Sequence, residues 1–93
     1  MLPKTNDKDF LFDAILSLEN REECYAFFED LCTIKEVEAM AQRFQAAKLL
    51  MENKTYETII AQTDISSATL SRVSKCVHYG TGGYRSVLSK QKK

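Results

Sequence analysis

Glycine and proline are scarce in this chain of 93 residues, which holds three glycines and one proline. None of them falls between Lys8 and Tyr79. A stretch of this length without either residue favours helices and leaves few positions for tight hairpin turns. The length fits one domain. The sequence therefore predicts an all-α fold in a single helical domain over residues 1–93.

Histidine and paired cysteines are also in short supply. There is one histidine, and the three cysteines (Cys24, Cys32 and Cys76) are odd in number, with no pair at metal-ligand spacing. These counts argue against a Cys/His zinc site and favour free thiols in a reducing compartment. With a single histidine and no nucleophile next to a base, we expect no catalytic residue, no metal ligand and no enzyme activity.

Long apolar runs are absent, so no segment reaches the length of a membrane span, and no signal peptide is visible. We therefore expect a cytoplasmic protein without a membrane partner. The chain is nevertheless 44% hydrophobic, which is more than a lone helical domain of this size easily buries. This excess predicts that the chain associates with itself.

The net charge is zero, but the two signs are unevenly distributed along the chain. Residues 1–64 hold seven Lys/Arg and all thirteen Asp/Glu, whereas residues 65–93 hold six Lys/Arg and no acid. The first part therefore carries −6 and the second +6. Such asymmetry suggests that one end of the chain faces a polyanion. A basic tail from Lys90 to Lys93 explains only half of the positive charge.

Hydrophobic spacing predicts three helices in the first half of the chain. The first covers about residues 8–18, and Asn20 with Glu23 forms a capping-box pattern at the start of the second. Thr33 with Glu36 repeats this pattern before a long helix that runs to Met51. These three helices, within residues 1–53, are interpreted as the dimerisation part.

Two short helices follow and form a predicted helix-turn-helix over residues 55–79. The first covers about residues 56–63 with Thr55 as its cap, and the second covers about residues 67–79 with Ser66 as its cap. Gly80, Gly82 and Gly83 are expected to end the second helix. Residues 80–93 then supply a short helix, about 84–89, and the basic tail.

The second helix of this motif has two different faces. Leu70, Val73 and Val77 form an apolar stripe that we expect to face inward together with Ile59, Ile60 and Ile65. The other face carries small, hydroxylated or basic side chains and no acid: Ser67, Ala68, Ser71, Arg72, Ser74, Lys75 and His78. Small side chains let a helix enter the major groove of DNA, and hydroxyl and basic groups bind phosphates or base edges. The predicted DNA-binding residues are Ser66, Ser67, Ala68, Thr69, Ser71, Arg72 and Lys75.

Four segments resemble the tryptophan repressor family, specifically a branch whose effector is unassigned. They are LCTIKEVEAMAQRFQAAKLL (31–50), TYETI (55–59), SATLSRV (67–73) and GTGGY (80–84). The resemblance implies an intertwined homodimer whose two recognition helices enter successive major grooves of double-stranded DNA at a pseudo-palindromic operator. It implies a transcriptional regulator, most simply a repressor.

The resemblance also implies an effector pocket between the long helix and the recognition helix. The matching positions are Thr33, Arg43 and Arg72, and the two arginines could hold a carboxylate. The arginines could equally bind phosphates or pair with acidic side chains. Val73 would crowd a flat indole and Cys76 removes a hydroxyl, so L-tryptophan itself is not expected as the effector. No other cofactor is expected.

Three residues depart from the family pattern where the repressor contacts DNA. Glu57 and Ile60 occupy positions at which the repressor has basic residues, and Asp64 replaces the usual glycine of the turn. Aspartate tolerates the left-handed backbone of such a turn better than most residues. Glu57 could read a cytosine amino group or could repel phosphate. A helical adaptor that binds another protein through the hydroxyl-rich face is the alternative function.

Overall fold

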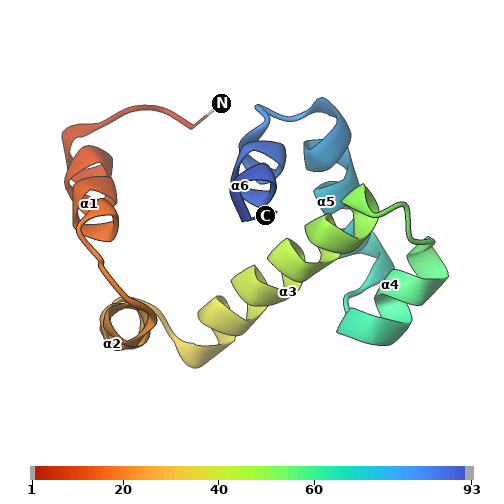
Figure 1. Cartoon of the computed structure of the whole chain (residues 1–93), viewed down its shortest axis with the longest axis horizontal. Coiled ribbons are helices and arrows are strands. Elements are labelled where there is room, and N and C mark those ends of the chain that lie inside the picture. Colours follow the sequence, from red (N-terminus) through yellow and green to blue (C-terminus); the bar gives the residue numbers. More distant parts are fainter. Residues whose placement is uncertain (1, 92–93) are drawn as a thin grey trace. The chain divides into compact units, whose positions relative to one another are not determined.

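The computed structural model describes residues 2–91, and every regular element in that range is an α-helix (Figure 1). The helices are, in chain order, α1 (Asn6–Leu16), α2 (Arg21–Leu31), α3 (Ile34–Met51), α4 (Tyr56–Thr63), α5 (Ser67–Tyr79) and α6 (Gly83–Gln91). The all-α prediction is confirmed. Within this range no helix is both long enough and apolar enough to cross a membrane.

The chain divides into two compact units between Val37 and Glu38, a point that lies within α3. The first unit holds α1, α2 and the first turn of α3. Helix α1 begins at Asn6, two residues before the expected start, because the Thr5 side chain accepts a hydrogen bond from Lys8 N–H and caps it. The prediction of one domain over 1–93 with dimerisation helices over 1–53 stays a prediction.

The caps of α2 and α3 form as the sequence predicts, with one difference. Asn20 Oδ1 accepts from Glu23 N–H at 2.8 Å, but Glu23 Oε1 accepts from Glu19 N–H at 2.9 Å and not from Asn20. At the start of α3 the box is complete, since Thr33 and Glu36 exchange bonds of 2.8 and 3.1 Å. The Thr33 backbone N–H, and then its hydroxyl, hold the pKa of Glu36 below its ordinary value. This stabilisation of α3 is therefore lost as the pH falls through that lowered pKa.

The second unit, from Glu38 onward, contains the hydrophobic core. Helix α4 packs on α5, and α5 packs on α6. The buried side chains come from the second half of α3 and from the three helices that follow it, and they are Ala46, Ala47, Leu49, Leu50, Ile59, Ile65, Leu70, Val73, Val77 and Leu88. By contrast, neither α1 nor α2 contributes a buried residue to the described structure.

Helix α6 is longer than the six residues expected at 84–89, since it covers Gly83–Gln91 and includes Lys90 of the predicted tail. Lys92 and Lys93 lie outside the described residues. Gly80 ends α5 with an ordinary negative φ of −82°, and not in the left-handed conformation that often ends a helix. Its small size is required, because a Cβ at this position would lie 2.4 Å from Cys76 O. The left-handed residue is Gly82, at φ +90°.

Candidate nucleic-acid interface

The turn between α4 and α5 has the conformation that the sequence predicts. Asp64 ends α4 in the left-handed region, at φ 60° and ψ 19°, and its N–H bonds to Ile60 O. Ile65 follows and is buried, and Ser66 then caps α5 by accepting from Thr69 N–H at 3.1 Å. Thr55 caps α4 in the same way through Thr58 N–H at 3.2 Å. Two capped helices joined by a three-residue turn (64–66) form the predicted helix-turn-helix.

The apolar stripe of α5 faces the core, as expected. Leu70, Val73 and Val77 are the buried residues of this helix. They share the core with Ile59 of α4 and Ile65 of the turn. Because one side of α5 is fixed against the core, its opposite side is set toward solvent.

That opposite side is exposed and carries no acid. Five of the seven predicted DNA-binding residues are exposed and take no part in capping α5, namely Ser67, Ala68, Ser71, Arg72 and Lys75. His78 is exposed as well, whereas Ser74 is half-buried. The first turn of α5 also lacks an acidic residue. The structure thus brings basic and small hydroxylated side chains together on one free helical surface, which we call the α5 outer face (Ser67, Ala68, Ser71, Arg72, Lys75 and His78).

The remaining two predicted DNA-binding residues, Ser66 and Thr69, are hydrogen-bonded to each other. The Ser66 hydroxyl accepts from Thr69 N–H and donates to Thr69 Oγ1 at 2.9 Å. Thr69 is also half-buried. These two hydroxyls therefore hold the start of α5 in place.

The three departures from the family pattern lie in or beside α4. Glu57 is exposed in the first turn of α4, where a carboxylate is favoured by the helix dipole. Ile60 is half-buried and packs against the core, so its apolar side chain has a packing role. Asp64 is exposed in the turn.

The predicted effector residues differ in their surroundings. Thr33 uses its hydroxyl and its N–H to cap α3. Arg43 is half-buried on α3, and Arg72 is exposed on α5. Thr33 belongs to the first unit and the two arginines to the second. The carboxylate site at these residues stays a prediction.

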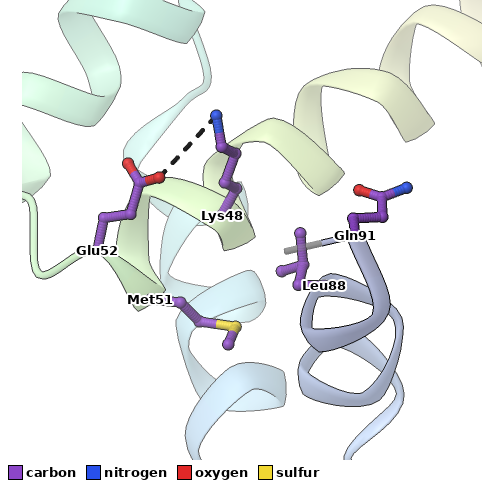
Figure 2. A pocket seen from close by; sticks show the side chains of 5 residues that line it. All are labelled: Lys48, Met51, Glu52, Leu88 and Gln91. Carbon is purple, nitrogen blue, oxygen red and sulfur yellow. Dashed lines mark ion pairs between the residues drawn. The ribbon is translucent and has the colours of Figure 1, made fainter. Parts of the chain in front are cut away.

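A small pocket of about 200 Å³ lies elsewhere, between the end of α3 and α6 (Figure 2). Lys48 and Glu52 form an ion pair of 3.9 Å at its edge, and such an exposed pair contributes little to stability. Its lining residues are Lys48, Met51, Glu52, Leu88 and Gln91, and none of them is a predicted effector residue. The pocket therefore has no bearing on the predicted carboxylate site.

Sequence reasoning missed two side chains that hold the motif from outside. Gln42 of α3 donates from Nε2 to Thr63 O at 3.0 Å, and Arg85 of α6 donates from Nε to Val77 O at 2.8 Å. For Arg85 a signal exists, since a basic residue shortly after a helix end can bond its last carbonyls. For Gln42 there is none, because the bond joins residues 21 positions apart.

The capped helix pair, its buried stripe and its acid-free outer face define a helical protein of the helix-turn-helix class. The family model described as Trp repressor protein matches residues 6–92, so the chain belongs to the Trp repressor family. The resemblance seen in the sequence is thereby confirmed. This is a family of regulators and not of enzymes.

Three relatives support this assignment. The uncharacterised protein YerC of Bacillus subtilis (strain 168) is 49% identical over 84 residues, which cover 90% of this chain and 81% of that protein. The crystal structure of a candidate Trp repressor from Staphylococcus aureus superposes with a TM-score of 0.91 at 46% identity, covering 94% of this chain and 87% of the other. A TrpR-like protein from Eubacterium eligens ATCC 27750 gives a TM-score of 0.91 at 47% identity, with 94% and 90% covered.

Proposed function

We propose that the chain is a sequence-specific DNA-binding regulator that inserts α5 into the major groove of a pseudo-palindromic operator and represses transcription. The observation that carries this proposal is the α5 outer face, which is exposed, basic and free of acid while the inner side of the same helix is buried. A helix selected only for solubility commonly mixes acidic with basic side chains. Membership in the Trp repressor family supports the same role.

Position along α5 divides the proposed contacts into two kinds. In helix-turn-helix proteins the N-terminal residues of the recognition helix reach base edges. Ser67, Ala68 and Ser71 would accordingly lie nearest the bases, while Arg72 and Lys75 would bind the phosphate backbone. Phosphate contacts position the protein and base contacts supply sequence specificity.

The proposed effector site is formed by Arg43 and Arg72. A carboxylate held between a residue of α3 and a residue of α5 would link those two helices, and Arg72 would serve both the effector and the DNA backbone. Val73 is buried and Cys76 is exposed on the same helix. L-tryptophan is not the proposed ligand, because Val73 would crowd its indole ring and Cys76 lacks a hydroxyl that could bind its amino group.

Arg72→Ala tests the proposed DNA binding. Duplexes selected from a random pool by the wild-type chain would serve as the specific probe, with a scrambled duplex as the non-specific probe. We expect weaker binding to both, and the slope of log affinity against log salt should shrink by about 2 for the proposed dimer, because each of its two Arg72 side chains would release close to one counterion. Gel-shift titrations at several salt concentrations give both quantities.

Lys90→Ala is the control, because it removes one positive charge from α6, outside the helix-turn-helix. It should leave the affinity and the salt slope near those of the wild type. Unchanged binding by Arg72→Ala would contradict the proposed backbone contact. A wild-type chain that selects no duplex, and whose interactions show no salt dependence, would instead favour a helical adaptor that binds protein.

We further propose that the regulator is a homodimer, and the apolar surface of the first unit supports this. Phe10, Leu16, Tyr25 and Ile34 are each at least 74% exposed. Large apolar side chains left exposed in this number are typical of a surface that another chain covers. Light scattering at micromolar concentration should therefore give the mass of two chains, and a single-chain mass would contradict the proposal.

Leu16→Glu should shift this equilibrium toward the monomer. Leu16 is 82% exposed, so the change removes an apolar side chain from the proposed interface and adds a charge there. Ser17→Glu is the matched control, because it adds the same charge at the next position and removes no apolar group. A dimer that tolerates both changes equally would exclude Leu16 from the interface.

A further inference from the structure

Two side chains from outside the helix-turn-helix bind the ends of its two helices. The acceptor of Gln42 is Thr63 O, at the last residue of α4, and the acceptor of Arg85 is Val77 O, in the last turn of α5. The last four carbonyls of a helix lack partners within that helix. Each bond therefore satisfies a free carbonyl and at the same time ties a helix of the motif to α3 or α6.

The bond from Arg85 is part of a firmly fixed connection. Gly80 lies so close to Cys76 O that no Cβ fits, so the chain leaves α5 in close contact with the last turn of that helix. Tyr84 stacks on Phe44 of α3, with ring centroids 6.4 Å apart and planes inclined by 28°. Leu88 is buried in the core. Helix α6 is thus packed on α3, and the bond from Arg85 ties the end of α5 to α6.

The bond from Gln42 is made to a residue that is itself held by two further hydrogen bonds. The Thr63 hydroxyl donates to Ile59 O at 2.7 Å and accepts from Ile65 N–H at 3.3 Å, so Thr63 links the end of α4 to the turn. Gln42 is half-buried, which protects its bond to Thr63 O from competition with water. The end of α4 is therefore held to α3 at the point where the turn begins.

We propose that Gln42 and Arg85 are positioning residues that fix the orientation of α4 and α5 for the reading of bases. This inference rests on the proposed DNA-binding function. A base contact requires the side chain to sit within a fraction of an ångström of its partner, whereas phosphate contacts through long basic side chains tolerate small tilts. Loss of either bond should therefore reduce the affinity for a specific sequence more than the affinity for any duplex.

The variants Arg85→Gln and Gln42→Ala test this proposal. Each should lower the affinity for the selected duplex by about two- to twelve-fold, the equivalent of one hydrogen bond, and leave the affinity for the scrambled duplex within about twofold. The salt slope should stay at the wild-type value, because neither residue is proposed to contact phosphate. The matched controls are Lys90→Gln, which removes the same charge from α6, and Gln45→Ala, which shortens an exposed glutamine of α3. Both should bind as the wild type does.

Hydrogen exchange supplies a readout that does not need DNA. In the free protein, the amides near the end of α5 should exchange faster in Arg85→Gln than in Lys90→Gln, and those near the end of α4 faster in Gln42→Ala than in Gln45→Ala. Unchanged exchange would show that these bonds do not stabilise the helix ends and would overturn the proposal. Faster exchange with unchanged specific affinity would overturn the positioning role.

Two further outcomes separate this inference from the proposed function. An equal loss on both duplexes with a smaller salt slope would show that Arg85 binds phosphate, and this would overturn its positioning role. A wild-type chain that binds no duplex would overturn the proposed function and the positioning role that rests on it. The exchange comparison would still show whether the bonds hold the motif.

Discussion

Ser71→Glu is expected to abolish DNA binding while the protein remains folded. Ser71 lies on the α5 outer face, is exposed and faces away from the buried stripe. A carboxylate there would meet the phosphates of the groove, and like charges brought together at an interface cost several kcal/mol, which corresponds to a loss of roughly 100-fold or more in affinity. The fold should tolerate the change, because glutamate is a good helix former and stands four residues before Lys75. Gel shifts and circular dichroism measure the two properties.

Two controls identify the cause of such a loss. Ser71→Gln adds almost the same volume without a charge, so it should retain much more affinity than Ser71→Glu. Lys75→Gln removes the positive charge that a new carboxylate could neutralise by pairing with it. If Ser71→Glu and Lys75→Gln bind DNA equally well, the loss of affinity in Ser71→Glu comes from neutralisation of the Lys75 charge and not from repulsion between the new carboxylate and the phosphates. Native affinity in Ser71→Glu would contradict the assignment of this face to DNA.

The helix-turn-helix could be predicted from the sequence because its determinants are local. Ser66 and Thr55 cap helices by bonding amides three residues ahead. Leu70, Val73 and Val77 follow the helical repeat, so their burial could be predicted from their spacing. Asp64 adopts the left-handed conformation that its side chain tolerates. Each of these features depends on neighbours within one or two turns of the same helix.

The bonds of Gln42 and Arg85 could not be predicted in this way, since they depend on how helices pack. Gln42 stands next to Arg43 in an ordinary polar part of α3, and nothing in its spacing indicates Thr63 as a partner. The same limit explains Ser74, which periodicity places on the outer side but which is half-buried in the folded chain. Thr69, a predicted DNA-binding residue, is half-buried as well. A period of 3.6 residues gives the direction of a side chain and not the depth of the neighbouring surface.

The first unit shows a different limit. Spacing predicted its helices, and the structure contains helices in these places, with the apolar side chains of Phe10 and Leu16 exposed. An apolar face indicates that something covers it, but the pattern of residues does not specify the partner. The dimer is therefore a proposal that rests on this exposed surface and on the family.

Leu70→Ala is expected to have the largest effect on stability. Leu70 is fully buried, at 0% exposure, and lies in the core beside the motif. Truncation of a buried leucine to alanine costs about 2–5 kcal/mol, from lost burial and from the cavity left behind. The free energy of unfolding of a chain of this size is roughly 5–14 kcal/mol, so the loss would remove a large share of it. Urea unfolding at one fixed protein concentration measures the change, since the stability of a dimer varies with concentration.

Tyr79→Ala is the matched control for this prediction, because it removes a larger side chain from the same helix at a position that is 86% exposed. Its free energy of unfolding should stay within about 0.5 kcal/mol of the wild type. Leu70→Ala should also weaken DNA binding, although Leu70 does not face the groove, because the stripe that holds α5 against the core also sets the direction of its outer face. Equal stability losses in the two variants would contradict the buried placement of Leu70. The affinity of Leu70→Ala for the selected duplex is measured under conditions where the variant is folded. If the variant is destabilised but binds with wild-type affinity, the α5 outer face keeps its orientation without this contact.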